Sequence, residues 1–252
     1  MQKHVDLNSD MGEGFGPWRM GDDAALLQTI TSANIACGFH AGDADVMAAT
    51  MTAALENGVG IGAHPGLPDL QGFGRRNMAV SHAEAANMVA YQLGAAQAMA
   101  RRAGGTVRHL KLHGALSHMA VADPGLARAC FEAALAVDPE IVLVVLAATP
   151  MEAVARDLGA NWAGEIFADR AYEDDASLVA RGKPGAVLHD AEAAAERILT
   201  MLDAGAIIAE SGKRIPARID TICLHGDTAE AVEMARALRA RLEGAGVAPR
   251  RL

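Results

Sequence analysis

The sequence has few cysteines, and they lie far apart. Its 252 residues include three, Cys37, Cys130 and Cys223. An odd number of widely spaced cysteines makes neither a disulfide framework nor a paired-thiolate zinc site, and such sparse use suits a reducing compartment. We therefore expect a cytoplasmic protein without a disulfide framework.

Positive charge and long apolar runs are also scarce. There are 22 lysines and arginines against 31 aspartates and glutamates, a net charge of -9 that repels nucleic-acid phosphates and anionic lipids. The longest apolar run, residues 141–148, is far shorter than the about twenty residues of a membrane-spanning helix. Residues 1–4 lack the apolar core of a signal peptide. Neither nucleic acid nor a membrane is an expected partner.

Common local motifs of nucleotide and hydrolase chemistry are absent. The chain has no G-x-x-x-x-G-K-[ST] phosphate loop, no H-E-x-x-H zinc motif, no G-x-S-x-G elbow and no G-x-G-x-x-G after a strand. It therefore carries no sequence signature of independent ATP binding, of a metalloprotease helix or of a serine hydrolase.

Apolar strand-like runs alternate with alanine-rich stretches of helical period, which predicts βα units around a parallel sheet. No linker rich in proline, glycine or serine divides the chain. We therefore expect a single α/β domain over residues 1–252, a TIM-like (β/α) barrel. The predicted strands are residues 4–8, 32–36, 59–64, 108–113, 141–147, 162–167, 206–209 and 221–225.

Turn and capping signals refine this prediction. Ser81 and Glu84 form a capping box for a helix that ends near Gly104. Asp123 and Thr149, each followed by proline, are predicted to start two further helices, and residues 227–228 are predicted to start the last one. Residues 210–213 look like a turn between short strands, an irregularity in the alternation. The tail, residues 244–252, follows a helix-breaking segment and is expected to be frayed.

Four predicted strands lead into a histidine with a glycine close behind it. These histidines are His40, His64, His113 and His225, and Asp227 follows the last of them. Strand exits of a closed parallel barrel share one rim, which is where such barrels carry their active sites. A single histidine at a strand end is usually structural, but four with the same pattern predict a catalytic cluster, in which we include Asp227.

The first predicted strand carries alternating polar residues. Asp6, Asn8 and Asp10 should point to one face of this strand. Two carboxylates near one rim could bind a metal, orient histidines or act as a general base, whereas Asx turns and caps are the structural alternative. A calcium loop is excluded, because Met11 and Pro17 stand where an EF-hand needs glycine and glutamate.

Basic residues lie in the same regions. Arginine forks suit a carboxylate or phosphate, although arginines in loops are often solvated surface residues. Lys111 lies two residues before His113 and hence on the same strand face. Glu165 lies on a buried strand and should pair with a cation. The predicted substrate-binding residues are Asn8, Glu13, Arg75, Arg76, Lys111, Glu165, Asp169 and Arg170.

Cysteines close to two of the histidines raise a further alternative, a thiolate nucleophile. Cys37 precedes His40, and Cys223 precedes His225. Cysteine is commonly a small buried residue, and adjacent positions of a strand point to opposite faces. We therefore favour a structural role for both.

Five segments closely resemble the LamB/YcsF family, the A subunits of bacterial ATP-dependent 5-oxoprolinase. They are residues 6–13, 33–43, 62–76, 167–172 and 223–227. The resemblance runs nearly end to end and implies a β/α-barrel-like fold related to polysaccharide deacetylases. It also implies a complex with two further subunits that opens 5-oxo-L-proline to L-glutamate at the expense of ATP.

One segment departs from the family pattern. The family usually has Lys-Pro-His-Gly-Ala-Leu-Tyr-Asn, whereas this chain has Lys111-Leu-His-Gly-Ala-Leu-Ser117-His118. The lysine and His113 are retained, but the aromatic hydroxyl is lost. Substrate preference could therefore differ.

A lactam-opening hydrolase is the first functional hypothesis. Phosphorylation of the lactam oxygen, with ATP used on a partner subunit, would give an imidate that water can attack. This requires a base, an acid and cations for the anionic groups. The residues assigned are Asp10 or Asp6 as base, His113 or His225 as acid, and Lys111, Arg75 and Arg76 as anion binders.

Two other hypotheses remain. A metal-dependent deacetylase or amidohydrolase would act without ATP, with Asp10, His40 and His64 as candidate ligands. A non-enzymatic protein that binds a cyclic amide is the third, and the crowding of titratable groups at the rim argues against it.

Overall fold

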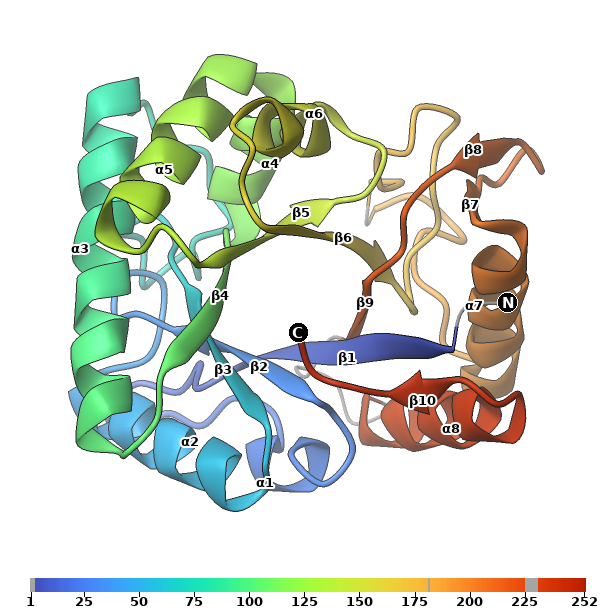
Figure 1. Cartoon of the computed structure of the whole chain (residues 1–252), viewed down its shortest axis with the longest axis horizontal. Coiled ribbons are helices and arrows are strands. Elements are labelled where there is room, and N and C mark those ends of the chain that lie inside the picture. The colour runs from blue at the N-terminus through green and yellow to red at the C-terminus, as the bar shows by residue number, and fades with distance from the viewer. Residues whose placement is uncertain (1–2, 181, 225–230) are drawn as a thin grey trace.

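A closed parallel barrel forms the centre of the protein. The structure, a computed structural model, describes residues 3–180, 182–224 and 231–252. Seven strands of this part of the chain pair in parallel, each with the next, and the last pairs with the first (Figure 1). In barrel order they are β1 (His4–Met11), β2 (Ser32–Ala36), β3 (Gly60–His64), β4 (Val107–Lys111), β5 (Val142–Leu146), β6 (Trp162–Phe167) and β9 (Thr221–Leu224).

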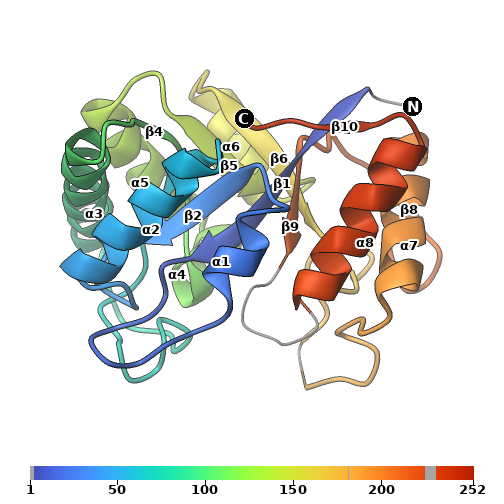
Figure 2. The ribbon, with the colours of Figure 1, turned by 90° about the horizontal axis from the view of Figure 1, so that it is seen from below.

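Helices cover the outside of the barrel (Figure 1). Figure 2 shows the loops after β1 and β3 at the end of the barrel opposite the two chain termini. Among the described helices, none combines the length and the apolar character needed to cross a membrane. The helices are α1 (Asp23–Leu26), α2 (Ala44–Glu56), α3 (His82–Arg102), α4 (Gly114–Ala122), α5 (Pro124–Val137), α6 (Pro150–Asp157), α7 (Ala191–Ala204) and α8 (Ala231–Gly244).

The predicted α/β barrel is confirmed, but one predicted barrel strand is wrong. Residues 206–209 were expected in the barrel, yet β7 (Ala206–Ile208) pairs antiparallel with β8 (Arg214–Pro216). The turn predicted at residues 210–213 joins these two short strands. Because β6 pairs directly with β9, the barrel closes without β7.

The prediction of a frayed C-terminal tail is also wrong. α8 continues to Gly244, and Val247 is buried. β10 (Ala248–Pro249) pairs in parallel with the start of β1, and the Ala248 amide donates to the Lys3 carbonyl at 2.9 Å. Without β10, this edge at the start of β1 would be unpaired. The pairing and the burial of Val247 explain why the tail is held.

The predicted capping signals are largely confirmed. The Ser81 hydroxyl accepts a hydrogen bond from the Glu84 amide at the start of α3, and the Ser81 amide donates the reciprocal bond to the Glu84 carboxylate. The Asp123 carboxylate caps α5 by accepting from the amides of Gly125 and Leu126, whereas Thr149 makes no side-chain cap to α6. The residues that begin the last helix in the sequence prediction, 227–228, lie outside the described part of the chain.

The barrel interior is polar and hydrogen-bonded, unlike the branched apolar filling of many TIM barrels. Asn34 on β2 donates to Asn8 at 2.7 Å and to Asp10 at 2.9 Å. His109 Nε2 donates to the Asn34 side-chain oxygen at 2.8 Å. Gly62 makes room for this ring, because a Cβ there would lie 2.0 Å from His109 Nε2.

Asp6 occupies the amino-terminal end of this interior. Its carboxylate accepts hydrogen bonds from the hydroxyls of Thr31, Ser32 and Thr221, at 2.7, 2.6 and 2.5 Å. Burial raises the pKa of Asp6 to about 6, and these hydrogen bonds only partly oppose the effect. Four residues of strand place Asp6 roughly 13 Å from Asp10 along β1.

The raised pKa of Asp6 predicts a specific pH dependence of stability. The folded state binds this proton more tightly than the unfolded state, so stability falls as pH rises through the window from about 4 to about 6. Replacing Asp6 by Asn removes this contribution. Between pH 4.5 and pH 7, we expect the free energy of unfolding of the wild type to fall by about 2 kcal/mol relative to that of Asp6→Asn.

Urea unfolding of both proteins across this pH range measures the difference. The same substitution at exposed Asp203 of α7 is the matched control and should follow the wild type. Parallel stability curves for the wild type and Asp6→Asn would contradict the prediction.

Candidate active site

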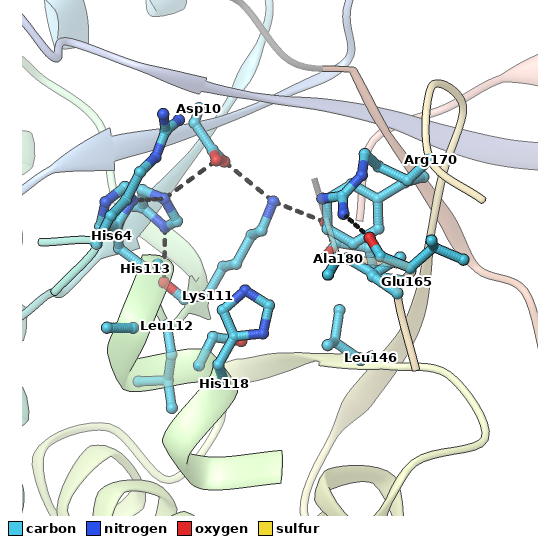
Figure 3. Close-up of a pocket in the computed structure, with 17 residues that line it drawn as sticks. Asp10, His64, Lys111, Leu112, His113, His118, Leu146, Glu165, Arg170 and Ala180 are labelled. Carbon is cyan, nitrogen blue, oxygen red and sulfur yellow. Dashed lines mark hydrogen bonds and ion pairs between the residues drawn. The ribbon is translucent and has the colours of Figure 1, made fainter. Parts of the chain in front are cut away.

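A pocket of about 310 Å³ opens at the carboxyl ends of the barrel strands (Figure 3). Asp10 lies near the end of β1, His64 ends β3 and Lys111 ends β4. Some of the predicted residues therefore converge at one rim. The predicted residues that line the pocket are Asp10, His64, Arg75, Lys111, His113, Glu165 and Arg170.

A buried ammonium group lies on one side of the pocket. Lys111 Nζ is 3.0 Å from Asp10 Oδ1 and 2.8 Å from Glu165 Oε1, and 3.1 Å from the sulfur of Cys223. Although burial opposes its charge, the carboxylates of Asp10 and Glu165 hold the pKa of Lys111 well above its usual value. The predicted pairing of Glu165 with a cation is thus found, and Lys111 is that cation.

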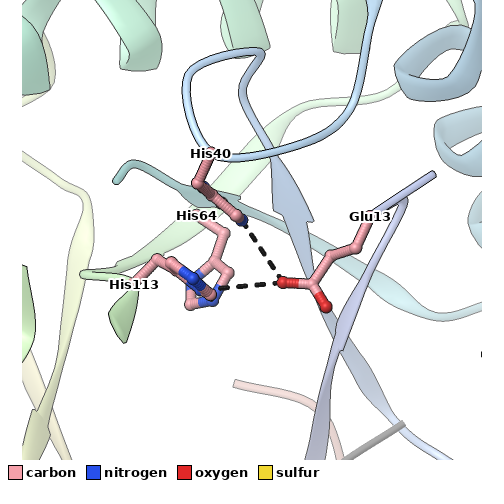
Figure 4. A group of neighbouring side chains, drawn as sticks. All are labelled: Glu13, His40, His64 and His113. Atoms are coloured by element: carbon pink, nitrogen blue, oxygen red, sulfur yellow. Dashed lines mark hydrogen bonds and ion pairs between the residues drawn. The ribbon is translucent and has the colours of Figure 1, made fainter. Parts of the chain in front are cut away.

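Three imidazoles and one carboxylate lie on the other side of the pocket (Figure 4). His40 stacks on His113 with 3.6 Å between ring centroids, and His64 meets both rings edge-on. Glu13 Oε1 lies 3.3 Å from His40 Nε2 and 3.6 Å from His113 Nδ1. Sequence reasoning placed Glu13 among the substrate-binding residues, whereas the structure brings it into the histidine cluster.

The loop after β3 holds this cluster in place. The Pro65 carbonyl accepts from the backbone amide of His113 at 2.9 Å, and the Phe73 carbonyl accepts from His113 Nε2 at 2.8 Å. Gly74 has a φ of +61° and touches the stacked rings, so that a Cβ there would lie 2.7 Å from the Cβ of His40. A glycine at this position lets the loop close over the two imidazoles.

The ionisation states of the cluster follow from burial and neighbouring charges. Burial, with His64 adding to it, lowers the pKa of His113 to about 3, and burial also lowers that of His40. Burial opposes ionisation of Asp10, yet His64 and Lys111 hold the pKa of its carboxyl well below its usual value. Neutral imidazoles accept protons or bind metals, so His113 is less suited to be the acid than to be a base or ligand.

Asp10 is the carboxylate of β1 that reaches the pocket. Its Oδ2 lies 3.3 Å from His64 Nε2. Asp6 and Asn8 point into the barrel below it, where they bond to Thr221 and other interior groups. His225 and Asp227, both predicted to be catalytic, lie outside the described residues.

The predicted arginines differ in position. Arg75 lines the pocket and lies over the Phe73 ring, whereas Arg76 pairs with Asp69 and its side chain is 65% exposed. Arg170 donates to the carbonyls of residues 179 and 186, so its guanidinium also holds the loop that follows β6. Asp169 is buried beside Arg170 in this loop and is not among the described residues that line the pocket.

Sequence reasoning missed several polar residues at or below the site. His109 and Asn34 form the layer beneath Asp10. The alternation of side chains along a strand could have indicated them, as His109 shares its strand face with Lys111. Ser117 and His118 of α4 line the pocket at the point where the chain departs from the family pattern.

The structure favours structural roles for the cysteines. Burial raises the pKa of Cys37 to about 12 and that of Cys223 well above its usual value. Thiols with such values are not thiolates at neutral pH, which argues against the nucleophile alternative.

Comparisons with known proteins identify the family of this chain. It is 65% identical over 243 residues to the A subunit of 5-oxoprolinase from Ruegeria pomeroyi, with 96% of each chain covered. A crystal structure of a lactam utilization protein from Thermus thermophilus matches with a TM-score of 0.94 and 42% identity, covering 99% of this chain and 100% of that one.

The fold extends to more distant proteins. The catalytic domain of a peptidoglycan N-acetylglucosamine deacetylase from Eubacterium rectale matches with a TM-score of 0.53 and 8% identity, covering 99% of this chain and 88% of that one. This likeness concerns the fold alone. The model of the LamB/YcsF family matches residues 5–252. The chain belongs to the LamB/YcsF family.

Proposed function

We propose that this chain is the A subunit of a 5-oxoprolinase, which opens the lactam of 5-oxo-L-proline to give L-glutamate. The observation that carries the proposal is 65% identity, over nearly the whole length, to a protein of that name. The pocket agrees with it. Its volume of about 310 Å³ is at the small end of ligand pockets, which suits a single small ring.

The reaction requires an activated lactam, because an amide carbonyl is a poor electrophile. Transfer of a phosphoryl group from ATP to the lactam oxygen would give an imidate, whose ring carbon is a better electrophile. Water would then add to this carbon, and the ring C–N bond would break as the nitrogen takes a proton. A second water molecule would hydrolyse the resulting acyl phosphate to glutamate and phosphate. A base near the water and cations near the anionic groups lower the barriers of these steps.

The pocket residues can be assigned to these tasks. Lys111 and Arg75 are the proposed binders of the substrate carboxylate or the phosphate, since both line the pocket. Arg76 is less suited, because Asp69 already pairs with it. Asp10 is the proposed base in preference to Asp6, which lies roughly 13 Å deeper along β1.

A substitution at Asp10 tests this assignment. Positioned acid or base groups commonly contribute about 10²- to 10⁴-fold in rate, so Asp10→Asn should reduce turnover of the complete complex by that order. His113→Ala should have a comparable effect, since its imidazole lines the same pocket and is suited to act as a base or a ligand. The assay is glutamate release from 5-oxoproline with ATP and the partner subunits.

Cys37→Ser is the control for these variants. Cys37 is buried and its sulfur donates to the Ile35 carbonyl, so we expect near wild-type turnover. Near wild-type rates in Asp10→Asn and His113→Ala, with both variants folded, would refute the assignment.

We further propose that ATP is used on a partner subunit. The sequence has no phosphate-binding loop. The phosphorylated lactam would have to reach this pocket before bulk water destroys it, which favours docked subunits with facing active sites. We therefore place the partner interface beside the pocket rim.

This division of labour predicts that the isolated chain is nearly inactive with 5-oxoproline and ATP. Adding the two partner subunits should restore ATP-dependent glutamate formation. Efficient cleavage by the isolated chain with ATP would show that phosphorylation occurs here instead.

The loop after β1 offers an aromatic side chain for this interface. Trp18 is 70% exposed, and its backbone exchanges two hydrogen bonds with Phe15 at 3.0 Å. Exposed aromatic residues on ordered loops are typical anchors of protein interfaces. The loop follows the carboxyl end of β1 and hence lies at the pocket end of the barrel (Figure 2).

Trp18→Ser should therefore weaken assembly without damaging the pocket. We expect lower activity at limiting concentrations of the partners and recovery of wild-type turnover when they are in excess. Tyr91→Ser on α3, where the tyrosine is 67% exposed, removes a comparable side chain from a helix outside the barrel and serves as control. An unchanged dependence on partner concentration in Trp18→Ser would exclude this loop from the interface.

A metal-dependent amidohydrolase that acts without ATP is the second candidate function. The cluster of Glu13 with three histidines is the observation that favours it. Such an enzyme would cleave its amide as an isolated chain and without ATP. The assay of the isolated chain, run with and without ATP, therefore separates the two candidates.

A further inference from the structure

The tautomers of two histidines in the pocket are fixed by backbone carbonyls. His64 Nδ1 lies 2.8 Å from the carbonyl oxygen of Lys111, and His113 Nε2 lies 2.8 Å from that of Phe73. A carbonyl oxygen only accepts, so both of these ring nitrogens must carry hydrogen. In a neutral imidazole the other nitrogen then presents a lone pair.

The two remaining nitrogens face each other. His64 Nε2 and His113 Nδ1 are 3.0 Å apart. Each also faces a carboxylate oxygen, with Asp10 Oδ2 at 3.3 Å from the first and Glu13 Oε1 at 3.6 Å from the second. All four atoms are acceptors in this state, so their buried contact is unfavourable unless a cation lies between them.

The spacing of these atoms fits a metal ion. Donors at about 2.0 to 2.1 Å from a tetrahedral zinc ion are separated from one another by about 3.3 to 3.4 Å. In the cluster, His113 Nδ1 lies 3.0 Å from His64 Nε2 and 3.6 Å from Glu13 Oε1, and His40 Nε2 lies 3.3 Å from the same Glu13 oxygen. These three distances lie on both sides of the separation expected between zinc ligands. One candidate ligand atom from each of Glu13, His40, His64 and His113 lies within 4.8 Å of the other three.

The surroundings of the histidines also fit a metal centre. Histidines that bind metals usually donate their second ring nitrogen to a carbonyl or carboxylate, which orients the ring. His64 and His113 both have such a carbonyl partner. The stacking of His40 on His113, under the loop of Gly74, keeps its Nε2 beside Glu13.

We propose that Glu13, His40, His64 and His113 bind one divalent transition-metal ion of the Zn²⁺ type. This ligand set differs from the one expected from the sequence, because Glu13 and His113 join His40 and His64, and Asp10 stands beside the ion. Three imidazoles with a carboxylate select such ions over Mg²⁺ and Ca²⁺, which prefer all-oxygen sites.

The site itself does not depend on the proposed function, whereas its chemical role does. An ion at this position would border the same pocket as Lys111. In a 5-oxoprolinase subunit it would serve as a Lewis acid toward a water molecule or an oxygen of the substrate.

Metal titration of the chelator-treated full chain tests the inference. We expect one Zn²⁺ per chain by calorimetry, a rise in melting temperature on addition of Zn²⁺, and visible absorption bands when Co²⁺ is the probe. Mg²⁺ in large excess should not compete. Absence of Zn²⁺ and Co²⁺ binding would overturn the proposal and leave a shared proton as the cation between the two imidazoles.

Variants locate the bound ion. Glu13→Gln and His113→Asn should each weaken Zn²⁺ binding at least about tenfold, since even residues that only support metal ligands contribute that much. His82→Asn on α3 is the matched control, because His82 is exposed and pairs with Asp123 away from the cluster. Unchanged affinity in folded Glu13→Gln and His113→Asn would place the ion elsewhere and overturn the proposal.

Folding and function are followed separately. Circular dichroism of the metal-free variants shows whether they fold. If His113→Asn does not fold, Glu13→Gln still tests the site, because it preserves the shape of the side chain. Zinc binding is measured without partner subunits or ATP. A chain that binds no metal but supports 5-oxoproline cleavage in the complex would refute the metal site alone, and the reverse result would refute the proposed function alone.

Discussion

The buried ammonium group of Lys111 is the interaction on which the barrel interior depends. Burying an unpaired charge costs several kcal/mol, and breaking a buried ion pair by removing one partner typically costs about 3 to 5 kcal/mol. Compensation comes from Asp10 on β1, Glu165 on β6 and the thiol of Cys223 on β9. A slip of one residue in any of these strands would turn its partner group out of the barrel, so the ammonium fixes their register.

The same residue connects the two sides of the pocket. The Lys111 side chain binds one oxygen of Asp10, while the other oxygen faces His64. The Lys111 carbonyl in turn accepts from the opposite nitrogen of the His64 ring. The cationic side and the imidazole side therefore share their supports, and a change at either side alters the electrostatic field at the other in this low-dielectric interior.

Sequence alone could predict the face of each strand but not the depth along it. Alternation put Asp6 and Asp10 on one face of β1, yet their positions differ by four residues, and only Asp10 reaches the rim. Arg76 looked equivalent to Arg75 until the fold brought Asp69 within reach of its guanidinium.

Contacts made by loops were equally hidden. Glu13 joins the histidines because the chain turns after β1, and the loop of Gly74 closes over His40 and His113. The alternation of side chains along a strand does not predict the course of either loop. The barrel itself could be predicted, because buried strands alternating with amphipathic helices leave few other folds open. The exclusion of β7 from the barrel could not, because it follows from the direct pairing of β6 with β9.

The pairing of β1 with β9 and β10 has a consequence for synthesis on the ribosome. β1 emerges before the other strands of the barrel, but one of its edges finds partners only in residues much later in the sequence, such as Thr221 and Ala248. Until those residues emerge, the nascent barrel has an open edge along β1, and its polar interior is exposed to water. Contacts between residues that lie so far apart in the sequence slow folding, and they leave strand edges available for wrong pairing. β9 and β10 thus act late, as the strands that close the barrel against β1.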